Sequence, residues 1–191
     1  MGTDAITDED LMLRIGDGDQ TAYGMLVDRH LSQNLGYATK ILGNVSEAEE
    51  VMQEAFIRVC KHASRWDPAR KTRFTTWFYR VVTNLCYDVG RKRKPQDNVE
   101  MLETVASDDM SAENVIEVNQ RSEQVQEALD ALPQRQKMAI ILCYFEGLSN
   151  REASDVMEVS LNALESYLVR ARRNLADILK DDKASLLKEI G

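Results

Sequence analysis

Residues 149–175 read SNREASDVMEVSLNALESYLVRARRNL, and this stretch decides the expected fold. Ser149 precedes a short helical pattern, and Glu152 follows three residues later, which is the spacing of a capping box at a helix N-terminus. Ser160 is a second N-cap residue, at the start of a longer helical pattern. The two residues before Ser160 would form a tight turn. The stretch therefore predicts a helix-turn-helix.

Helical periodicity covers most of the remaining chain, and the three prolines mark its interruptions. Pro68 falls in an expected loop, Pro95 marks the end of a helix and of a domain, and Pro133 sits at the first position of a new helix. We therefore predict an all-α fold in which an acidic flexible linker joins two small helical domains. The expected limits are 8–95 for the N-terminal domain, 96–119 for the linker, 120–180 for the C-terminal domain and 181–191 for a tail.

Glycines and caps give the expected helices of the N-terminal domain. Two short helices precede Gly43, which ends the second. Ser46 is the expected N-cap of the next helix, with Glu49 as its capping-box partner, and this helix runs to about Ala63. Apolar periodicity resumes at Trp77 and continues to the next proline. The C-terminal domain is expected to contain helices over 115–132, 133–147, 149–157 and 160–179.

The formal charge of the chain is −8, but its charges are strongly segregated. Residues 65–95 contain 9 basic and 2 acidic residues, whereas residues 96–132 contain 1 basic and 10 acidic residues. A polyanion senses the local field, because charges more than about 10 Å away are largely screened at moderate salt. The acidic total therefore does not exclude nucleic acid as a partner.

The composition, with 43% apolar and 29% charged residues, is typical of globular proteins. The longest apolar run, residues 138–145, is far shorter than the roughly 20 residues that span a bilayer. The acidic N-terminus does not have the pattern of a signal peptide, so we expect a cytoplasmic protein. The three cysteines, Cys60, Cys86 and Cys143, are expected to be buried free thiols rather than disulfide partners.

In a helix-turn-helix, residues near the start of the second helix reach base edges in the major groove. Asn can pair with adenine, Glu can accept from cytosine and Ala can contact the thymine methyl group. The expected base-contacting residues are Ser160, Asn162, Ala163, Glu165 and Ser166. The expected phosphate-contacting residues are Asn150, Arg151, Arg170, Arg172 and Arg173. The alternative is a helical hairpin whose charges are only solvated.

The stretch RFTTWFYRVVTNLCYDVGRKRK, residues 73–94, concentrates aromatic and basic side chains. This combination suits single-stranded nucleic acid, because bases stack on aromatic rings while Lys and Arg neutralise the backbone. Arg70, Lys71 and Arg73 in the preceding loop are candidates to hold an extruded base. The alternative is that the aromatic residues are mostly core and that the basic end of the helix is solvated.

A third feature is an acidic helix face in EEVMQEAFIRV, residues 49–59. Glu50, Gln53 and Glu54 share the face opposite the apolar residues, which is either solvated surface or a docking site for a basic partner. Catalysis has little support, because the chain shows no convergent catalytic set and no phosphate-binding glycine loop. Cys60 and His62 form an isolated pair without a second pair of ligands. We therefore expect neither an enzyme nor a bound metal or cofactor.

Three segments in this order resemble the extracytoplasmic-function group of bacterial sigma factors. SEAEEVMQEAFIRVC is similar to the helix that these proteins lay on RNA polymerase, and residues 73–94 are similar to their promoter-melting and minus-ten helix. Residues 132–175, LPQRQKMAIILCYFEGLSNREASDVMEVSLNALESYLVRARRNL, are similar to the domain that reads the minus-thirty-five element. The resemblance implies an alternative sigma factor that binds core RNA polymerase, directs promoter recognition and opening, and is controlled by an anti-sigma factor.

The resemblance also assigns roles to residues. It implies that Glu50, Gln53 and Glu54 contact core polymerase. It implies that minus-ten DNA is contacted by Arg70, Lys71, Arg73, Phe74, Trp77, Asn84, Asp88, Arg91 and Lys92. The base-contacting and phosphate-contacting residues of the helix-turn-helix would serve the minus-thirty-five element, and the acidic linker would run through polymerase.

The chain departs from the family pattern at two positions of the expected recognition helix. Glu165 and Tyr167 stand where the family commonly carries basic residues, which predicts an altered promoter consensus. Two rival functions remain open at this point. A stand-alone helix-turn-helix regulator would bind duplex DNA without polymerase, and a helical adapter would dock proteins without touching DNA.

Overall fold

The computed structural model describes residues 6–69, 72–93 and 124–189, and within these ranges every regular element is helical. The elements are α1 (Asp8–Gly16), α2 (Gln20–Leu42), α3 (Val45–Ala63), α4 (Phe74–Arg93), α6 (Gln134–Ile140), the π-helical turn η1 (Ile141–Phe145), α7 (Asn150–Val156) and α8 (Leu161–Glu189). Residues 124–130 are also helical. The all-α prediction is therefore confirmed, whereas the expected linker lies outside the described residues.

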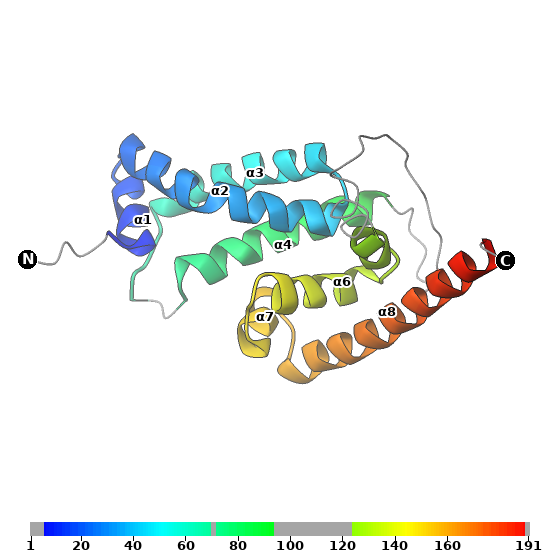
Figure 1. The fold of residues 1–191 in the computed structure, drawn as a ribbon. Coiled ribbons are helices and arrows are strands. Elements are labelled where there is room, and N and C mark those ends of the chain that lie inside the picture. The colour runs from blue at the N-terminus through cyan, green and yellow to red at the C-terminus, as the bar shows by residue number, and fades with distance from the viewer. Residues whose placement is uncertain (1–5, 70–71, 94–123, 190–191) are drawn as a thin grey trace, which may run out of the picture.

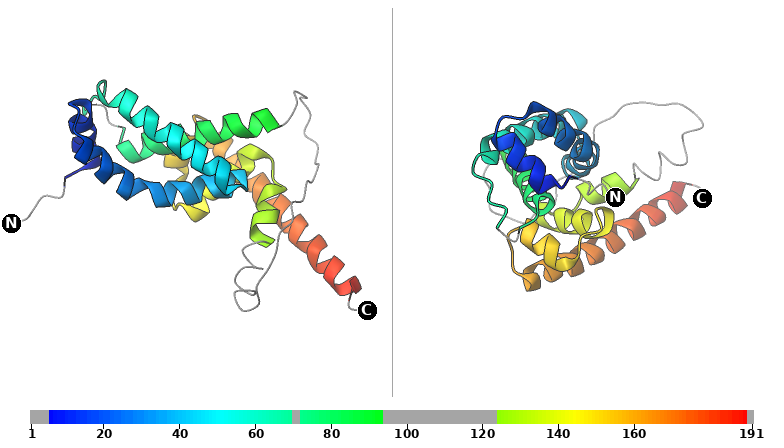
Figure 2. Two further views of the ribbon diagram at one scale, coloured as in Figure 1. Left: turned by 90° about the horizontal axis from the view of Figure 1, so that it is seen from above. Right: turned by 90° about the vertical axis from the view of Figure 1, so that its left-hand side faces the viewer.

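Helices α1 to α4 form an N-terminal unit (Figure 1), in which α2, α3 and α4 run side by side and α1 covers one end. Their apolar faces meet in a core that includes Leu26, Val59, Phe78 and Val82, all almost completely buried. Helices α6, α7 and α8 form the C-terminal unit, which lies against α4 (Figure 2). The buried residues of the two units form one continuous apolar cluster. The two predicted domains are therefore packed against each other.

The predicted cap of α3 is wrong by two residues. Asn44, not Ser46, is the N-cap, and its Oδ1 accepts a hydrogen bond from the backbone N–H of Glu47 at 3.0 Å. Gly43 ends α2 in a left-handed conformation with a φ of 67°, as predicted. Because Asn caps helices as well as Ser does, the first suitable residue after Gly43 takes the role.

The caps of the helix-turn-helix agree with the sequence. Ser149 and Glu152 form the predicted capping box, with the Ser149 N–H donating to Glu152 Oε2 at 2.9 Å. Ser160 Oγ accepts from the N–H of Ala163 at 3.2 Å. Glu158, in the turn between the two helices, has a φ of 53°, which is uncommon for a residue with a side chain.

Three boundaries in the C-terminal unit differ from those predicted. Pro133 is the N-cap of α6 and not its first residue, and α8 continues beyond residue 179 to Glu189. Helix α6 passes into η1 before the chain turns at Gly147, which has a φ of 70°. Of the helix predicted over 115–132, only residues 124–130 are seen, because residues 115–123 lie outside the described ranges.

The three cysteines are free, but they are not equally buried. Cys86 is completely buried and Cys143 is half-buried, whereas Cys60 on α3 is exposed, so the prediction that all three are buried is wrong for Cys60. Burial raises the pKa of the Cys86 thiol to about 12, so almost none of it is thiolate at neutral pH.

We expect a brief treatment of the folded protein with a maleimide to modify Cys60 first, Cys143 more slowly and Cys86 hardly at all. The order follows from exposure and thiolate content. Mass spectrometry of proteolytic fragments at successive times measures it, and treatment in guanidinium chloride is the control in which all three react. Modification of Cys86 as fast as Cys60 would contradict the packing of α4.

None of the described helices combines the length and the apolar composition that a membrane span requires. Within the same ranges, no group of three or more His, Cys, Asp or Glu side chains is placed to hold a metal ion.

Candidate nucleic-acid interface

Helix α4 and the residue before it carry a stripe of polar and aromatic side chains, here called the α4 stripe. Its members are Arg73, Trp77, Asn84, Asp88 and Arg91, which recur at intervals of three, four or seven residues and therefore share one face of the helix. Trp77 is half-buried and the other four are exposed. The structure thus brings five of the nine predicted minus-ten residues onto one surface.

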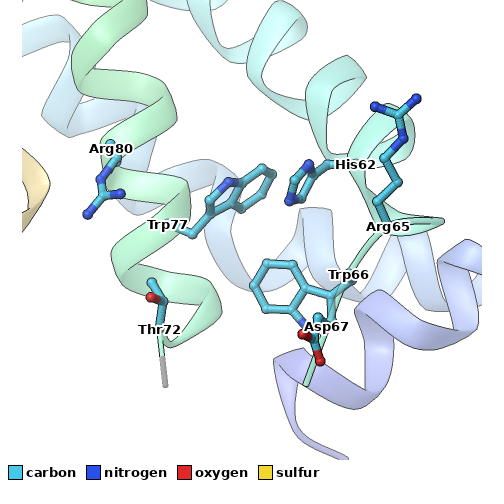
Figure 3. Close-up of a pocket in the computed structure, with 7 residues that line it drawn as sticks. All are labelled: His62, Arg65, Trp66, Asp67, Thr72, Trp77 and Arg80. Atoms are coloured by element: carbon cyan, nitrogen blue, oxygen red, sulfur yellow. The ribbon is translucent and has the colours of Figure 1, made fainter. Parts of the chain in front are cut away.

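Trp77 is held in place by two aromatic side chains from the end of α3 and the loop after it. The His62 ring stacks on Trp77 with centroids 4.9 Å apart and planes 16° apart (Figure 3). Trp66 meets Trp77 edge to face at 5.7 Å and 72°.

These three rings border a cavity of about 100 Å³, here called the aromatic cavity. Its walls are His62, Arg65, Trp66, Asp67, Thr72, Trp77 and Arg80 (Figure 3). Flat rings and two guanidinium groups are the groups that bind an unpaired base and its phosphate. Sequence reasoning missed His62, Arg65, Trp66 and Arg80 as site residues.

Phe74 is a correction to the predicted site. Its side chain is fully buried and stacks on Phe78 with centroids 5.4 Å apart and planes 17° apart. His30 of α2 packs against it at 5.1 Å. Its backbone N–H donates to Glu9 Oε1 of α1 at 2.8 Å, which caps the start of α4. Phe74 therefore belongs to the core, and the prediction that it contacts DNA is wrong.

The remaining predicted minus-ten residues have different outcomes. Arg70 and Lys71 lie outside the described residues, and Lys92 is exposed at the end of α4. Arg91 lies 3.8 Å from Asp88, so two members of the α4 stripe form a weak surface ion pair. Arg93 is used within the protein, because it pairs with Glu47 and donates to the carbonyl oxygen of Leu42 at 2.9 Å.

The acidic face of α3 has the predicted position. Glu50 and Gln53 are exposed and Glu54 is half-exposed, while Val51 and Ala55 on the opposite side are buried. Glu54 forms an ion pair with Arg58 at 3.0 Å, one turn further along the helix. The face is therefore free to dock a partner.

In the C-terminal unit, α7 and α8 form the predicted helix-turn-helix. The two helices pack through apolar side chains, because Ala153 and Val156 of α7 and Leu164 and Leu168 of α8 are all buried. Most predicted DNA contacts are exposed, namely Asn150, Arg151, Ser160, Asn162, Glu165, Arg170, Arg172 and Arg173, whereas Ala163 and Ser166 are half-buried. The Arg172 guanidinium lies over the Tyr144 ring at 5.6 Å.

Comparisons with known proteins agree with this arrangement. The family model described as Sigma-70 region 2 matches residues 26–96, and the one described as Sigma-70, region 4 matches residues 122–175. The chain is 30% identical over 174 residues to the ECF RNA polymerase sigma factor SigW of Bacillus subtilis, covering 86% of this chain and 92% of that protein. The chain belongs to the extracytoplasmic-function sigma factors.

Further relatives extend over similar lengths. The sigma factor is 29% identical over 185 residues to the RNA polymerase sigma-H factor of Pseudomonas aeruginosa, covering 91% of this chain and 94% of that one. It superimposes with a TM-score of 0.68 and 26% identity on CnrH, solved in complex with the cytosolic domain of CnrY, covering 92% and 98% of the two chains. The sigma factor RpoE of Bartonella quintana, solved with the anti-sigma factor NepR, shares the fold at a TM-score of 0.62 and 21% identity, over 83% and 96%.

The structure gives a reason for Tyr167 in the sigma factor. Tyr167 Oη accepts a hydrogen bond from Arg135 Nη1 at 3.2 Å, and the same guanidinium lies over the Tyr87 ring of α4 at 5.8 Å. The Tyr167 hydroxyl is therefore already engaged in a hydrogen bond within the protein. Glu165 is exposed and makes no ion pair among the described residues.

Proposed function

We propose that this alternative sigma factor binds core RNA polymerase, recognises promoter DNA and opens it at the minus-ten element. The observation that carries the proposal is the aromatic cavity beside the α4 stripe. An opened strand exposes unpaired bases and phosphates together, and this surface offers ring faces and guanidinium groups side by side. A regulator that binds only duplex DNA, or an adapter that binds only proteins, would not need a surface for unpaired bases.

Within this proposal, an unpaired base enters the aromatic cavity and stacks on the ring faces of its walls. Arg65 and Arg80 of the cavity walls, together with Arg73 one turn before Trp77, would neutralise the phosphates next to that base. Asn84 lies two turns further along the α4 stripe, where its amide can bond the next base. Removing a base from the stack costs a few kcal/mol, which these contacts must offset.

The helix-turn-helix would read the minus-thirty-five element. The start of α8 presents Ser160, Asn162 and Glu165 at its surface, where a major groove would receive them. A carboxylate accepts from the amino group of cytosine and repels phosphate. We therefore propose that Glu165 favours a cytosine at the facing position and weakens binding to other sequences.

The exposed face of α3 formed by Glu50, Gln53 and Glu54 would dock on core polymerase. We expect the triple variant Glu50→Ala/Gln53→Ala/Glu54→Ala to weaken binding to purified bacterial core polymerase at least tenfold, because it removes two charges and an amide from the contact. A fluorescence titration of labelled sigma factor with core enzyme measures the change.

The control for that titration is Asp28→Ala/Glu127→Ala, which removes two exposed carboxylates elsewhere on the surface. Unchanged affinity in the triple variant would exclude this face as the polymerase contact. If the wild-type chain bound strongly to duplex DNA and not at all to core polymerase, the stand-alone regulator would replace the sigma-factor proposal.

Control by an anti-sigma factor is also part of the proposal. CnrH is similar in fold over nearly its whole length and was solved with a bound partner, the cytosolic domain of CnrY. We propose a protein partner of the same kind here, and a cytoplasmic location, where polymerase and promoter are found. No catalytic step is needed for any of these roles.

A further inference from the structure

The outer face of α8 carries one apolar side chain among polar ones. Val169 is 63% exposed, which is the largest exposed fraction of any large apolar side chain among the described residues. On a helix, its surface neighbours stand three and four positions away. These neighbours are Glu165 and Ser166 before it and Arg172 and Arg173 after it. Val169 therefore lies in the middle of the expected DNA contacts, although the sequence does not predict it as one of them.

The packing of α8 holds Val169 outward. Helix α8 packs on α6 and α7, and its Leu164 and Leu168 side chains are almost completely buried there. On a neighbouring side of α8, the hydrogen bond from Arg135 of α6 to the Tyr167 hydroxyl fixes the rotation of the helix. At 3.6 residues per turn, Val169 points away from this packed side. A surface that approached the outer face of α8 would meet its two methyl groups.

The position of Val169, rather than its exposure alone, indicates a role. Single exposed apolar side chains are common on protein surfaces. A residue such as Lys or Arg at this position, however, would favour the helix more than β-branched valine does, and would also attract phosphate. An apolar side chain on a face that enters a major groove has one matching group there, the C5-methyl group of thymine.

The four bases offer different edges to a branched apolar side chain. Thymine presents its methyl group in the major groove, whereas guanine and adenine present only hydrogen-bonding groups and cytosine presents an amino group without the methyl. A polar edge that loses water against an apolar side chain and gains no partner is penalised. Val169 would therefore favour thymine by contact and disfavour the other bases by desolvation.

We infer that Val169 is a specificity-determining residue that contacts the methyl group of a thymine in the minus-thirty-five element. The inference rests on the proposed function of the helix-turn-helix. Val169 follows Glu165 by one turn, about 6 Å along the helix axis, which corresponds to about two base pairs at 3.4 Å each. Because helical side chains lean toward the N-terminus, Val169 covers the surface beside Glu165. The thymine therefore lies about two base pairs from the cytosine that faces Glu165.

The test uses the full chain bound to core polymerase. Duplexes with a randomised minus-thirty-five region are selected for binding, and the preferred duplex is then remade with deoxyuridine, which lacks only the methyl group, in place of each thymine in turn. Fluorescence anisotropy measures the affinity of wild type, of Val169→Ser and of the control Val125→Ser for each duplex. Serine has a helix propensity similar to that of valine. Val125 is 46% exposed and lies outside the helix-turn-helix.

We expect one deoxyuridine, about two base pairs from the cytosine, to weaken binding by wild type and by the control about fourfold, which corresponds to the loss of one buried methyl group. Val169→Ser should bind the thymine and deoxyuridine duplexes equally. Its affinity for the deoxyuridine duplex should equal that of wild type, which also shows that the variant is folded.

Two results would overturn the methyl contact while leaving the helix-turn-helix as the reader of this element. The first is a wild-type affinity that no deoxyuridine changes, and the second is a deoxyuridine penalty that Val169→Ser retains in full. A selection without any base preference in this region would instead overturn the proposed function of the helix-turn-helix, and the inference with it.

Discussion

Phe74→Ala is expected to lower the free energy of unfolding by about 3–5 kcal/mol, which is the usual cost of removing a buried phenyl ring. Phe74 is fully buried and lies within 6.2 Å of four other rings, those of His30, Trp66, Trp77 and Phe78. The rings that contact Phe74 come from α2, from α4 and from the loop after α3. The cavity left by the substitution can therefore close only if several elements move. Urea denaturation followed by circular dichroism measures the change.

The control is Phe74→Leu, which keeps most of the apolar volume and should cost much less. A variant Phe74→Ala that is almost as stable as wild type would show that the ring is not part of the core. The earlier assignment of Phe74 to minus-ten DNA would then regain support. The measurement therefore decides between two roles that the sequence alone leaves open for an aromatic residue at the start of a helix.

Arg73→Ala/Trp77→Ala is expected to reduce promoter opening by at least tenfold while leaving affinity for core polymerase unchanged. Loss of base stacking on an aromatic ring costs about 1–3 kcal/mol, and loss of a phosphate contact adds to it. The proposed polymerase contact consists of Glu50, Gln53 and Glu54 of α3, and neither substituted residue belongs to it. Permanganate reactivity of thymines in the minus-ten region of a promoter that this chain recognises measures opening directly.

Trp77→Phe is the control, because it keeps a ring face in the aromatic cavity. The circular dichroism spectrum and the denaturation midpoint of each variant show whether the fold is intact, since Trp77 also packs against His62 and Trp66. Opening that persists undiminished in the double variant would remove the α4 stripe from the melting step. A loss of polymerase binding in parallel would point instead to a general structural defect.

The helix-turn-helix could be predicted closely because its signals are local. Ser149, Glu152 and Ser160 satisfy backbone N–H groups within three residues of themselves, so their effect does not depend on the rest of the fold. The N-cap of α3 is predicted wrongly because the local signals leave two choices. Asn44 and Ser46 both suit the position, and the end of α2 at Gly43 decides between them.

The aromatic cavity could not be predicted, because its walls come from separate elements. His62 lies at the end of α3, Trp66 in the following loop and Arg80 in α4, and only the packing of α3 on α4 brings them together. The burial of Phe74 has the same origin. The contacts of Tyr79 and Arg80 with the C-terminal unit join residues 67 to 78 positions apart, at a separation where no sequence pattern specifies pairing.

The cap that Glu9 places on the first turn of α4 also bears on how this protein can be divided into fragments. The Sigma-70 region 2 match begins at residue 26, and a fragment that starts there follows directly from that boundary. Such a fragment would lack α1, whose Leu11 and Met12 are fully buried, and would leave the N–H of Phe74 without its acceptor. The smallest unit that keeps α4 intact therefore begins with α1, well before the region by which the family is recognised.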